Sequence, residues 1–314
     1  MNDMRKRQGS ALPRYTTPVP VRGWRWFVGT VVILLLWLVG GSLLGLVFLP
    51  YTGVSPSVLV DGGDILGAMP GWGFLFFALI TFVPLFLGVL LAYRWILGVK
   101  LRYLFSTVQD FRWWRVGLGF WVWLILIGGP VVVSLVLAPD QYRFNYQPET
   151  FIPFAIVGLL LLPIQTTAEE LFFRGWVLQW AGRRIGNIVV LSVISGVAFS
   201  LPHLLNPEVA GDFLGAFLGY FSVGFALAWV TVRDRSLEIA IGAHLSNNLF
   251  AALVVGYEGG ALPADALFVA GPIEWGTNNI VGLLVVSLFI LLTRAGRPKA
   301  PKMTFSDTVP RTDG

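Results

Sequence analysis

Residues 151–180 read FIPFAIVGLLLLPIQTTAEELFFRGWVLQW. The first half of this stretch is almost entirely apolar, and the whole exceeds the roughly 20 residues that a helix needs to cross a bilayer. The second half carries Glu169, Glu170 and Arg174 within the same run. Ionisable side chains at membrane depth are costly unless they are paired or line a wet cavity. The stretch therefore predicts a membrane-spanning helix with a functional site on it.

The rest of the chain has the composition of a membrane protein. Of its 314 residues, 56% are hydrophobic and 12% are charged, whereas soluble domains are about a quarter charged. The 13 tryptophans suit the interfaces between lipid and water. We therefore predict an all-α polytopic membrane protein in a lipid bilayer, with about eight transmembrane helices in a bundle. The predicted spans are residues 26–50, 72–96, 117–138, 151–180, 187–205, 212–232, 237–256 and 276–293.

The Lys and Arg residues fall in alternate loops between these spans. If both termini are cytoplasmic, 21 of the 22 lie in cytoplasmic segments, and Arg143 is the exception. Because cytoplasmic loops favour positive residues, we predict a multi-pass protein of the cell membrane with both termini cytoplasmic. The same distribution explains the net charge of +5 without nucleic acid, which we exclude as a partner. Polar cytoplasmic tails are predicted at 1–25 and 297–314, and the membrane domain at 26–293.

The ionisable groups of the fourth span differ in the partners available to them. Glu170 and Arg174 are four residues apart, so they share a helical face and predict an ion pair. That pair has a purely structural interpretation as well as a functional one. Glu169 points about 100° away from this face. It needs a histidine, a metal or water from elsewhere, which makes it the stronger candidate for chemistry.

The chain has only two histidines, and both lie inside predicted spans. His203 is near the end of the fifth span, where it also fits a helix-end histidine that points to water. His244 lies in the seventh span and shares a helical face with Asn248, four residues later. Taken alone, that pair equally fits hydrogen bonding between membrane helices. We interpret Asn247, on another face, as structural.

Together these side chains supply what peptide hydrolysis requires: a group that activates water and a group that stabilises the oxyanion. In one assignment, Glu169, His203 and His244 hold zinc with an open position for water. In the other, no metal is needed. Glu169 and His203 then polarise the water, while His244 and Asn248 donate to the oxyanion. The His-Glu-x-x-His signature is absent and does not decide the matter, and the lack of cysteine excludes a thiol nucleophile.

Three motifs occur in order on successive predicted membrane segments. They read Glu169-Glu170-Leu171-Phe172-Phe173-Arg174, Phe199-Ser200-Leu201-Pro202-His203 and His244-Leu245-Ser246-Asn247-Asn248. This arrangement resembles the CAAX proteases and bacteriocin-processing enzymes, the abortive-infection family of intramembrane metalloproteases, and is type II CAAX prenyl endopeptidase-like. The resemblance covers about residues 150–256, which it implies to be the catalytic core.

The resemblance also implies a fold and a function. The fold would be an eight-helix membrane bundle with a wet cavity. The chain would be an intramembrane endopeptidase acting on a peptide or a membrane-associated protein. Glu169 would be essential, Glu170 and Arg174 would support it, and the two histidines and Asn248 would complete the site.

Two other functions fit part of the pattern. A non-catalytic membrane scaffold or regulator could keep these motifs and bind partner membrane proteins. A proton-coupled transporter would also place Glu, His and Arg in the membrane, but the repeated halves typical of transporters are not found in the sequence.

The predicted spans place the two histidines at different depths. His203 lies about 16 residues from the cytoplasmic start of its span and His244 about 7 from its own. At 1.5 Å per residue the two differ in depth by roughly 14 Å. Either the predicted bounds of the spans are wrong, or helix tilt and a long cytoplasmic extension of the fourth span bring the two histidines level. A break at Pro163 and the unusual length of the fourth span favour the second explanation.

Overall fold

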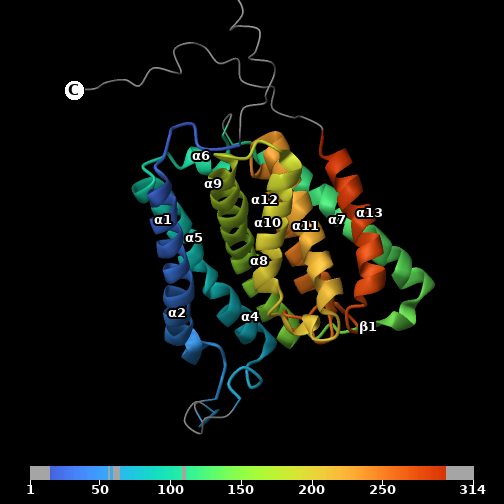
Figure 1. The fold of residues 1–314 in the computed structure, drawn as a ribbon. Helices are drawn as coiled ribbons and strands as arrows, with labels where there is room; N and C mark the ends of the chain where they lie inside the picture. The colour runs from blue at the N-terminus through green and yellow to red at the C-terminus, as the bar shows by residue number, and fades with distance from the viewer. Residues whose placement is uncertain (1–14, 56, 59–63, 108–110, 295–314) are drawn as a thin grey trace, which may run out of the picture.

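The computed structural model describes residues 15–55, 57–58, 64–107 and 111–294. They form a bundle of helices whose axes run roughly in one direction (Figure 1). The predicted all-α class is confirmed, because the β-structure within the described residues amounts to three short strands. The predicted tail at 297–314 and residues 1–14 of the other tail lie outside the described residues.

Six helices of the described chain are long and apolar enough to cross a membrane. They are Gly23–Tyr51, Gly71–Ile96, Trp113–Leu137, Pro148–Gly182, Phe213–Asp234 and Trp275–Leu292. The remaining two predicted spans form the shorter helices α10 (Ile188–His203) and α12 (Glu238–Leu249). Eight of the 12 residues of α12 are buried, so neighbouring helices rather than lipid surround most of it.

Three of these six long helices consist of several helical segments, and the other three are single α-helices. The bounds of their parts are α1 (Gly23–Leu35), η1 (Leu36–Gly40), α2 (Gly41–Phe48), η2 (Leu49–Tyr51), α4 (Gly71–Ile80), α5 (Phe82–Leu91), η3 (Ala92–Ile96), α7 (Trp113–Leu137), α8 (Pro148–Glu170), η5 (Leu171–Val177), α9 (Leu178–Gly182), α11 (Phe213–Asp234) and α13 (Trp275–Leu292). The connections include α6 (Arg102–Phe105), η4 (Pro139–Gln141) and η6 (Pro207–Val209). The segments η1, η3, η5 and η7 (Phe250–Val254, which follows α12) are π-helical. The break expected at Pro163 is absent, because α8 continues through it.

The described residues also form a small three-stranded sheet. It consists of β1 (Tyr142–Phe144), β2 (Val255–Tyr257) and β3 (Phe268–Ala270). Strand β3 is central, antiparallel to β1 and parallel to β2. The sheet lies at the end of the bundle opposite to α6 and α9 (Figure 1).

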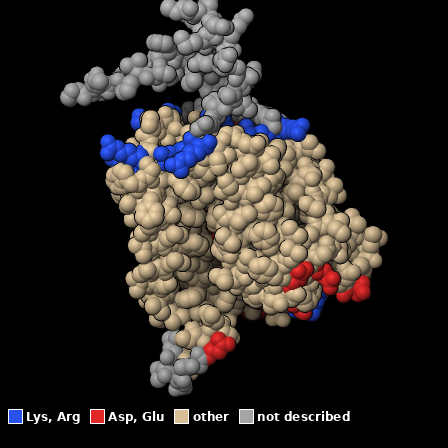
Figure 2. Space-filling model, in the orientation of Figure 1, with Lys and Arg blue, Asp and Glu red and all other residues tan. Residues whose placement is uncertain are grey.

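Charged side chains gather at the two ends of the bundle and leave a broad uncharged band between them. Figure 2 shows Lys and Arg along the upper rim and Asp and Glu near the lower end. The long helices between the two ends carry large apolar side chains that are exposed on the surface, among them Ile125 at 68%. Such a band suits the hydrocarbon core of a bilayer.

Part of the predicted N-terminal tail packs against the bundle. Tyr15 is 3% exposed and lies in a cluster with Leu178 and Leu191. Its hydroxyl donates to the backbone oxygen of Arg174 at 3.2 Å. A Cβ added at Gly182 would lie 1.9 Å from the backbone oxygen of Tyr15, so glycine is needed for this close approach.

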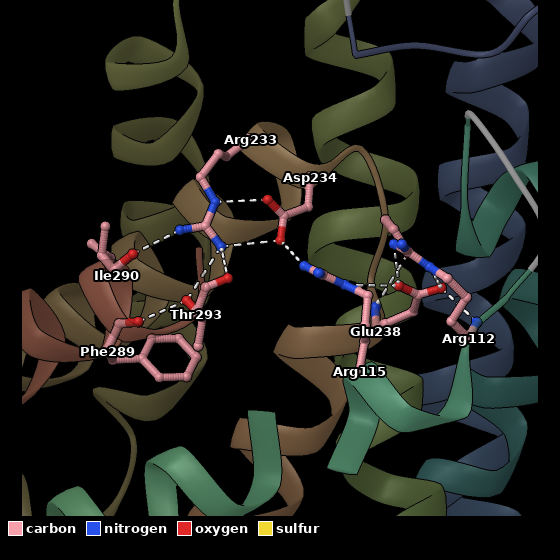
Figure 3. A network of polar contacts seen from close by, with 9 residues as sticks. Arg112, Arg115, Arg233, Asp234, Glu238, Phe289, Ile290 and Thr293 are labelled. Atoms are coloured by element: carbon pink, nitrogen blue, oxygen red, sulfur yellow. Dashed lines mark hydrogen bonds and ion pairs between the residues drawn. The ribbon is translucent and has the colours of Figure 1, made fainter. Parts of the chain in front are cut away.

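A chain of buried charges joins four helices at the positive end of the bundle (Figure 3). Arg233 pairs with Asp234 and also donates to the oxygens of Ile290 and Thr293. Asp234 pairs with Arg115.

Glu238 continues this chain on α12. It forms an ion pair with Arg115 at 3.2 Å and accepts a hydrogen bond from the side chain of Arg112 at 2.9 Å. Because Glu238 is the first residue of α12 and fully buried, these pairs fix the start of α12 inside the bundle.

Candidate active site

The fourth span carries three of the predicted site residues where α8 meets the π-helical η5. Glu169 and Glu170 end α8, and Arg174 lies in η5. All three are buried, with at most 5% of the residue exposed. Arg174 Nη1 donates to Glu170 Oε1 at 2.8 Å, which confirms the predicted pair. Its Nη2 donates to the oxygen of Gly224 at 3.2 Å, so the pair also holds α11.

His244 of α12 lies between the two carboxylates. Its Nδ1 is 2.7 Å from Glu170 Oε1, and its Nε2 is 3.4 Å from Glu169 Oε2. Glu169 thus finds a partner on another helix, as its position in the sequence predicts. Among the described residues, Glu169 Oε2 is buried and accepts no hydrogen bond.

The hydrogen bond to Glu170 determines what the other side of the His244 ring offers. A carboxylate can only accept a hydrogen bond, so Nδ1 of His244 carries a proton and donates to Glu170. In the neutral ring, Nε2 then presents a lone pair toward Glu169 Oε2. Two acceptors at that separation favour a proton, a water or a cation between them. The same arrangement, with a carboxylate on the outer nitrogen, is common for histidines that bind metals.

His203 is held in the corresponding way. It is the last residue of α10, and its Nδ1 lies 2.7 Å from the backbone oxygen of Phe199. Because a carbonyl oxygen only accepts, Nδ1 is the protonated nitrogen and Nε2 keeps its lone pair. Both histidines therefore offer Nε2 for chemistry.

Phe199 brings the three motifs together. Its ring centroid is 4.4 Å from that of His203 and 5.6 Å from that of His244. The guanidinium carbon of Arg174 lies 4.5 Å from the same centroid, within cation–π range. One buried aromatic ring thus contacts a predicted site residue from each motif.

Asn248 joins the site through a hydrogen-bonded row of side chains. Its Nδ2 donates to Gln165 Oε1 at 3.0 Å, and its Oδ1 accepts from Asn247 at 3.1 Å. Asn247 in turn accepts from the indole of Trp123 at 3.2 Å. An indole nitrogen can only donate, so it fixes which end of each amide faces which neighbour. The donor end of Asn248 consequently faces Gln165, one helical turn before Glu169.

The depth difference expected between the histidines is removed by the position of α12. Glu169 lies 13 residues before Gly182, and His203 lies 15 residues after Ile188. Residues Gly182 and Ile188 flank one short turn, so Glu169 and His203 are level at about 20 Å from it. His244 of α12 lies at the same level, because it contacts both Glu169 and Glu170.

The donors fit a metal in part. A tetrahedral zinc with bonds near 2.0–2.1 Å separates two ligand atoms by about 3.3 Å, close to the 3.4 Å between Glu169 Oε2 and His244 Nε2. The tautomers of both histidines fit as well. However, no three His, Asp or Glu side chains of the described residues form a group with metal-site spacing. Glu169 and His244 therefore fit zinc, whereas His203 is not grouped with them.

Some residues of this region were not predicted. Phe199 stands in the second motif, but only its place four residues before His203 pointed to a contact. Gln165 is polar in an apolar run and four residues before Glu169, which is a usable signal. Tyr220 stacks on His203 from α11, and the sequence gives no sign of that contact.

The fold and these contacts define a polytopic α-helical membrane protein with a buried carboxylate–histidine site. The profile of the type II CAAX prenyl endopeptidase Rce1-like family matches residues 148–250. An uncharacterized protein of Bacillus subtilis (strain 168), YyaK, is 31% identical over 241 residues, which cover 75% of this chain and 80% of that protein. The chain belongs to the Rce1-like family. No solved structure matches it significantly.

Family membership places the chain among proteases and agrees with the membrane helices. The matched region contains every predicted site residue: Glu169, Glu170, Arg174, His203, His244 and Asn248. Trp123, which ends the hydrogen-bonded row, lies outside it.

Proposed function

We propose that this chain is an intramembrane endopeptidase that hydrolyses a peptide bond in a membrane-associated protein or peptide. The observation that carries the proposal is the contact between Glu169 Oε2 and His244 Nε2 at 3.4 Å, inside the bundle. A buried carboxylate oxygen with no hydrogen bond from the described residues is costly to maintain. Glu169 Oε2 would be satisfied by a hydrogen bond from a water molecule, and the carboxylate could activate that water for attack on a peptide bond.

The neighbouring side chains have separate roles in this proposal. Glu169 takes the proton of the attacking water and gives it to the amine that leaves when the peptide bond breaks. Glu170, paired with Arg174, binds Nδ1 of His244 and so keeps Nε2 directed toward Glu169. Asn248 has a second Nδ2 hydrogen beyond the one given to Gln165, and that hydrogen serves the oxyanion of the peptide carbonyl.

We also propose zinc as the cofactor, with Glu169 and His244 as the ligands whose spacing fits it and His203, which is not grouped with them among the described residues, as the third ligand expected from the sequence. Bound there, it would lower the pKa of a water molecule and polarise the peptide carbonyl. In the metal-free alternative, Glu169 and His203 polarise the water, and His244 joins Asn248 at the oxyanion. The spacing of Glu169 and His244 supports the first arrangement.

We further propose that the protein lies in the cell membrane with its positive end in the cytoplasm. The separation of charge in Figure 2 supports this orientation. Helix α1 begins and α13 ends at that positive end, so both termini would be cytoplasmic (Figure 1).

The test is cleavage of a fluorescence-quenched peptide that ends in a prenylated CAAX sequence, by the full chain in lipid nanodiscs. Glu169→Gln should lower kcat at least about 100-fold, as removal of a catalytic acid–base group does. Glu149→Gln is the matched control, because Glu149 is an exposed carboxylate of the same helix. Equal cleavage by the wild type and Glu169→Gln would refute the proposed role. No cleavage by any variant, with partners still captured, would favour the scaffold.

Elemental analysis tests the metal separately. About one zinc per chain in the wild type, lost in the His203→Ala/His244→Ala variant, would support the zinc site. A wild type that cleaves the peptide after purification without zinc would instead support the metal-free mechanism.

A further inference from the structure

His203 needs a second support, because it ends its helix. A histidine at the last residue of α10 is free to turn toward the connecting loop, and its ring is only half-buried. The hydrogen bond from Nδ1 to Phe199 fixes one edge of the ring. One such bond still allows the ring to swing about it, so contacts on the ring faces decide where Nε2 points.

Tyr220 of α11 supplies the second support. Its ring centroid is 4.6 Å from that of His203, with 33° between the planes. Phe199 also packs against the imidazole, at 4.4 Å and 39°. The imidazole of His203 is therefore packed against two aromatic rings, one from its own helix and one from α11. Aromatic pairs at this separation attract beyond simple burial.

The connecting loop fixes Tyr220 in turn. The Tyr220 hydroxyl donates to Glu208 Oε1. Asn206 Nδ2 donates to the Tyr220 hydroxyl at 3.0 Å and to Glu208 Oε1 at 3.2 Å. The backbone of Asn206 donates to the oxygen of His203 at 3.1 Å, so the loop starts from the histidine that it supports. Trp275 of α13 donates to the backbone oxygen of Glu208 at 3.1 Å and lies 5.7 Å from the ring of Tyr220.

We propose that Tyr220 is a positioning residue, which holds the His203 imidazole so that Nε2 faces the site, and that Glu208 and Asn206 hold Tyr220. This role rests on the proposed function only where it concerns turnover. The orientation of the ring is a property of the protein with or without a substrate. Tyr220 acts through its ring face, and its hydroxyl acts by anchoring that ring.

The two roles of Tyr220 are separated by two substitutions. Tyr220→Ala removes the stack, and kcat should fall about tenfold or more, with KM changed less than about twofold. Tyr220→Phe keeps the stack and should retain at least about a third of kcat. Phe217→Ala is the matched control, because Phe217 lies one turn earlier on the same helix and stacks on Phe221. It should keep wild-type kcat.

Histidine NMR measures the ring directly. Because the chain has two histidines, protein labelled with ¹³C and ¹⁵N in histidine gives two sets of ring signals, and those missing in His203→Ala belong to His203. In the wild type and Tyr220→Phe, His203 should show one tautomer, protonated at Nδ1. In Tyr220→Ala the tautomers should average.

Each outcome decides between the claims. Unchanged His203 signals in Tyr220→Ala would overturn the proposal. Averaged signals with wild-type kcat, in a protein that Glu169→Gln inactivates, would also overturn it. If Glu169→Gln cleaves as well as the wild type, or neither cleaves, the proposed function fails, and the NMR signals alone decide whether Tyr220 positions the ring.

Discussion

Replacing Arg174 alone should destabilise the protein more than replacing Arg174 and Glu170 together. The guanidinium is fully buried and is the cation nearest to the carboxylate of Glu170, at 2.8 Å. Arg174→Met leaves that carboxylate buried, with His244 as its one remaining donor among the described residues. Breaking a buried pair in this way costs about 3–5 kcal/mol. The hydrogen bond to Gly224, worth about 1 kcal/mol, is also lost.

The double variant Glu170→Gln/Arg174→Met removes the unpaired charge. Its glutamine still offers an oxygen to His244 Nδ1, so the loss should shrink to about 1–2 kcal/mol. Resistance to unfolding by SDS, measured in detergent micelles, would compare the two variants. Arg94→Met is the control, because Arg94 is exposed, and it should match the wild type. A double variant no more stable than Arg174→Met would refute the reasoning.

Three other changes test the surrounding structure. Gly119→Ala should destabilise the protein by about 2–3 kcal/mol, because its Cβ would lie 2.2 Å from the backbone oxygen of Ile239 on α12. Gly117→Ala is the control, because a Cβ there meets open space, and it should be neutral in the same SDS titration. Glu238→Gln should lower the SDS resistance and also kcat, because α12 would lose the charge that fixes its start and with it the depth of His244; a stability loss with unchanged kcat would contradict this link. Burial raises the pKa of Asp265 above its ordinary value of 3.8, so its ionisation opposes folding increasingly as the pH rises above about 4. Asp265→Asn should therefore raise the melting temperature at pH 7 and have little effect at pH 4, and equal shifts at both pH values would contradict the burial effect.

The spans and one contact of the site could be predicted because they depend on local rules. Hydropathy identifies a lipid-facing helix, and the spacing of Glu170 and Arg174 on one helix determines that they meet. The length of α12 follows another rule. Eight of its 12 residues are buried, and a helix enclosed by protein need not match the thickness of the bilayer.

Contacts between helices could not be predicted from the sequence, because they depend on how the helices pack. The motifs bring Glu169 and His244 to the same region, but only packing decides that Glu170 takes Nδ1 of His244. The buried charges around Glu238 were hidden for a different reason. Arg115 and Arg233 look like ordinary loop charges that set topology, and nothing local shows that both turn inward to acids on α11 and α12.

The π-helical segment η5 makes the fourth span two helices out of phase with each other. Before it, Glu170 faces His244. Near the end of η5, Trp176 faces α1, where its indole donates to Thr30 at 2.9 Å and its ring lies 4.8 Å from Trp26. Shortening the chain by one residue between Glu170 and Trp176 would convert the segment to α-helix and rotate everything beyond it by about 100°. Such a chain could keep its catalytic face or its contact with the first span, but not both.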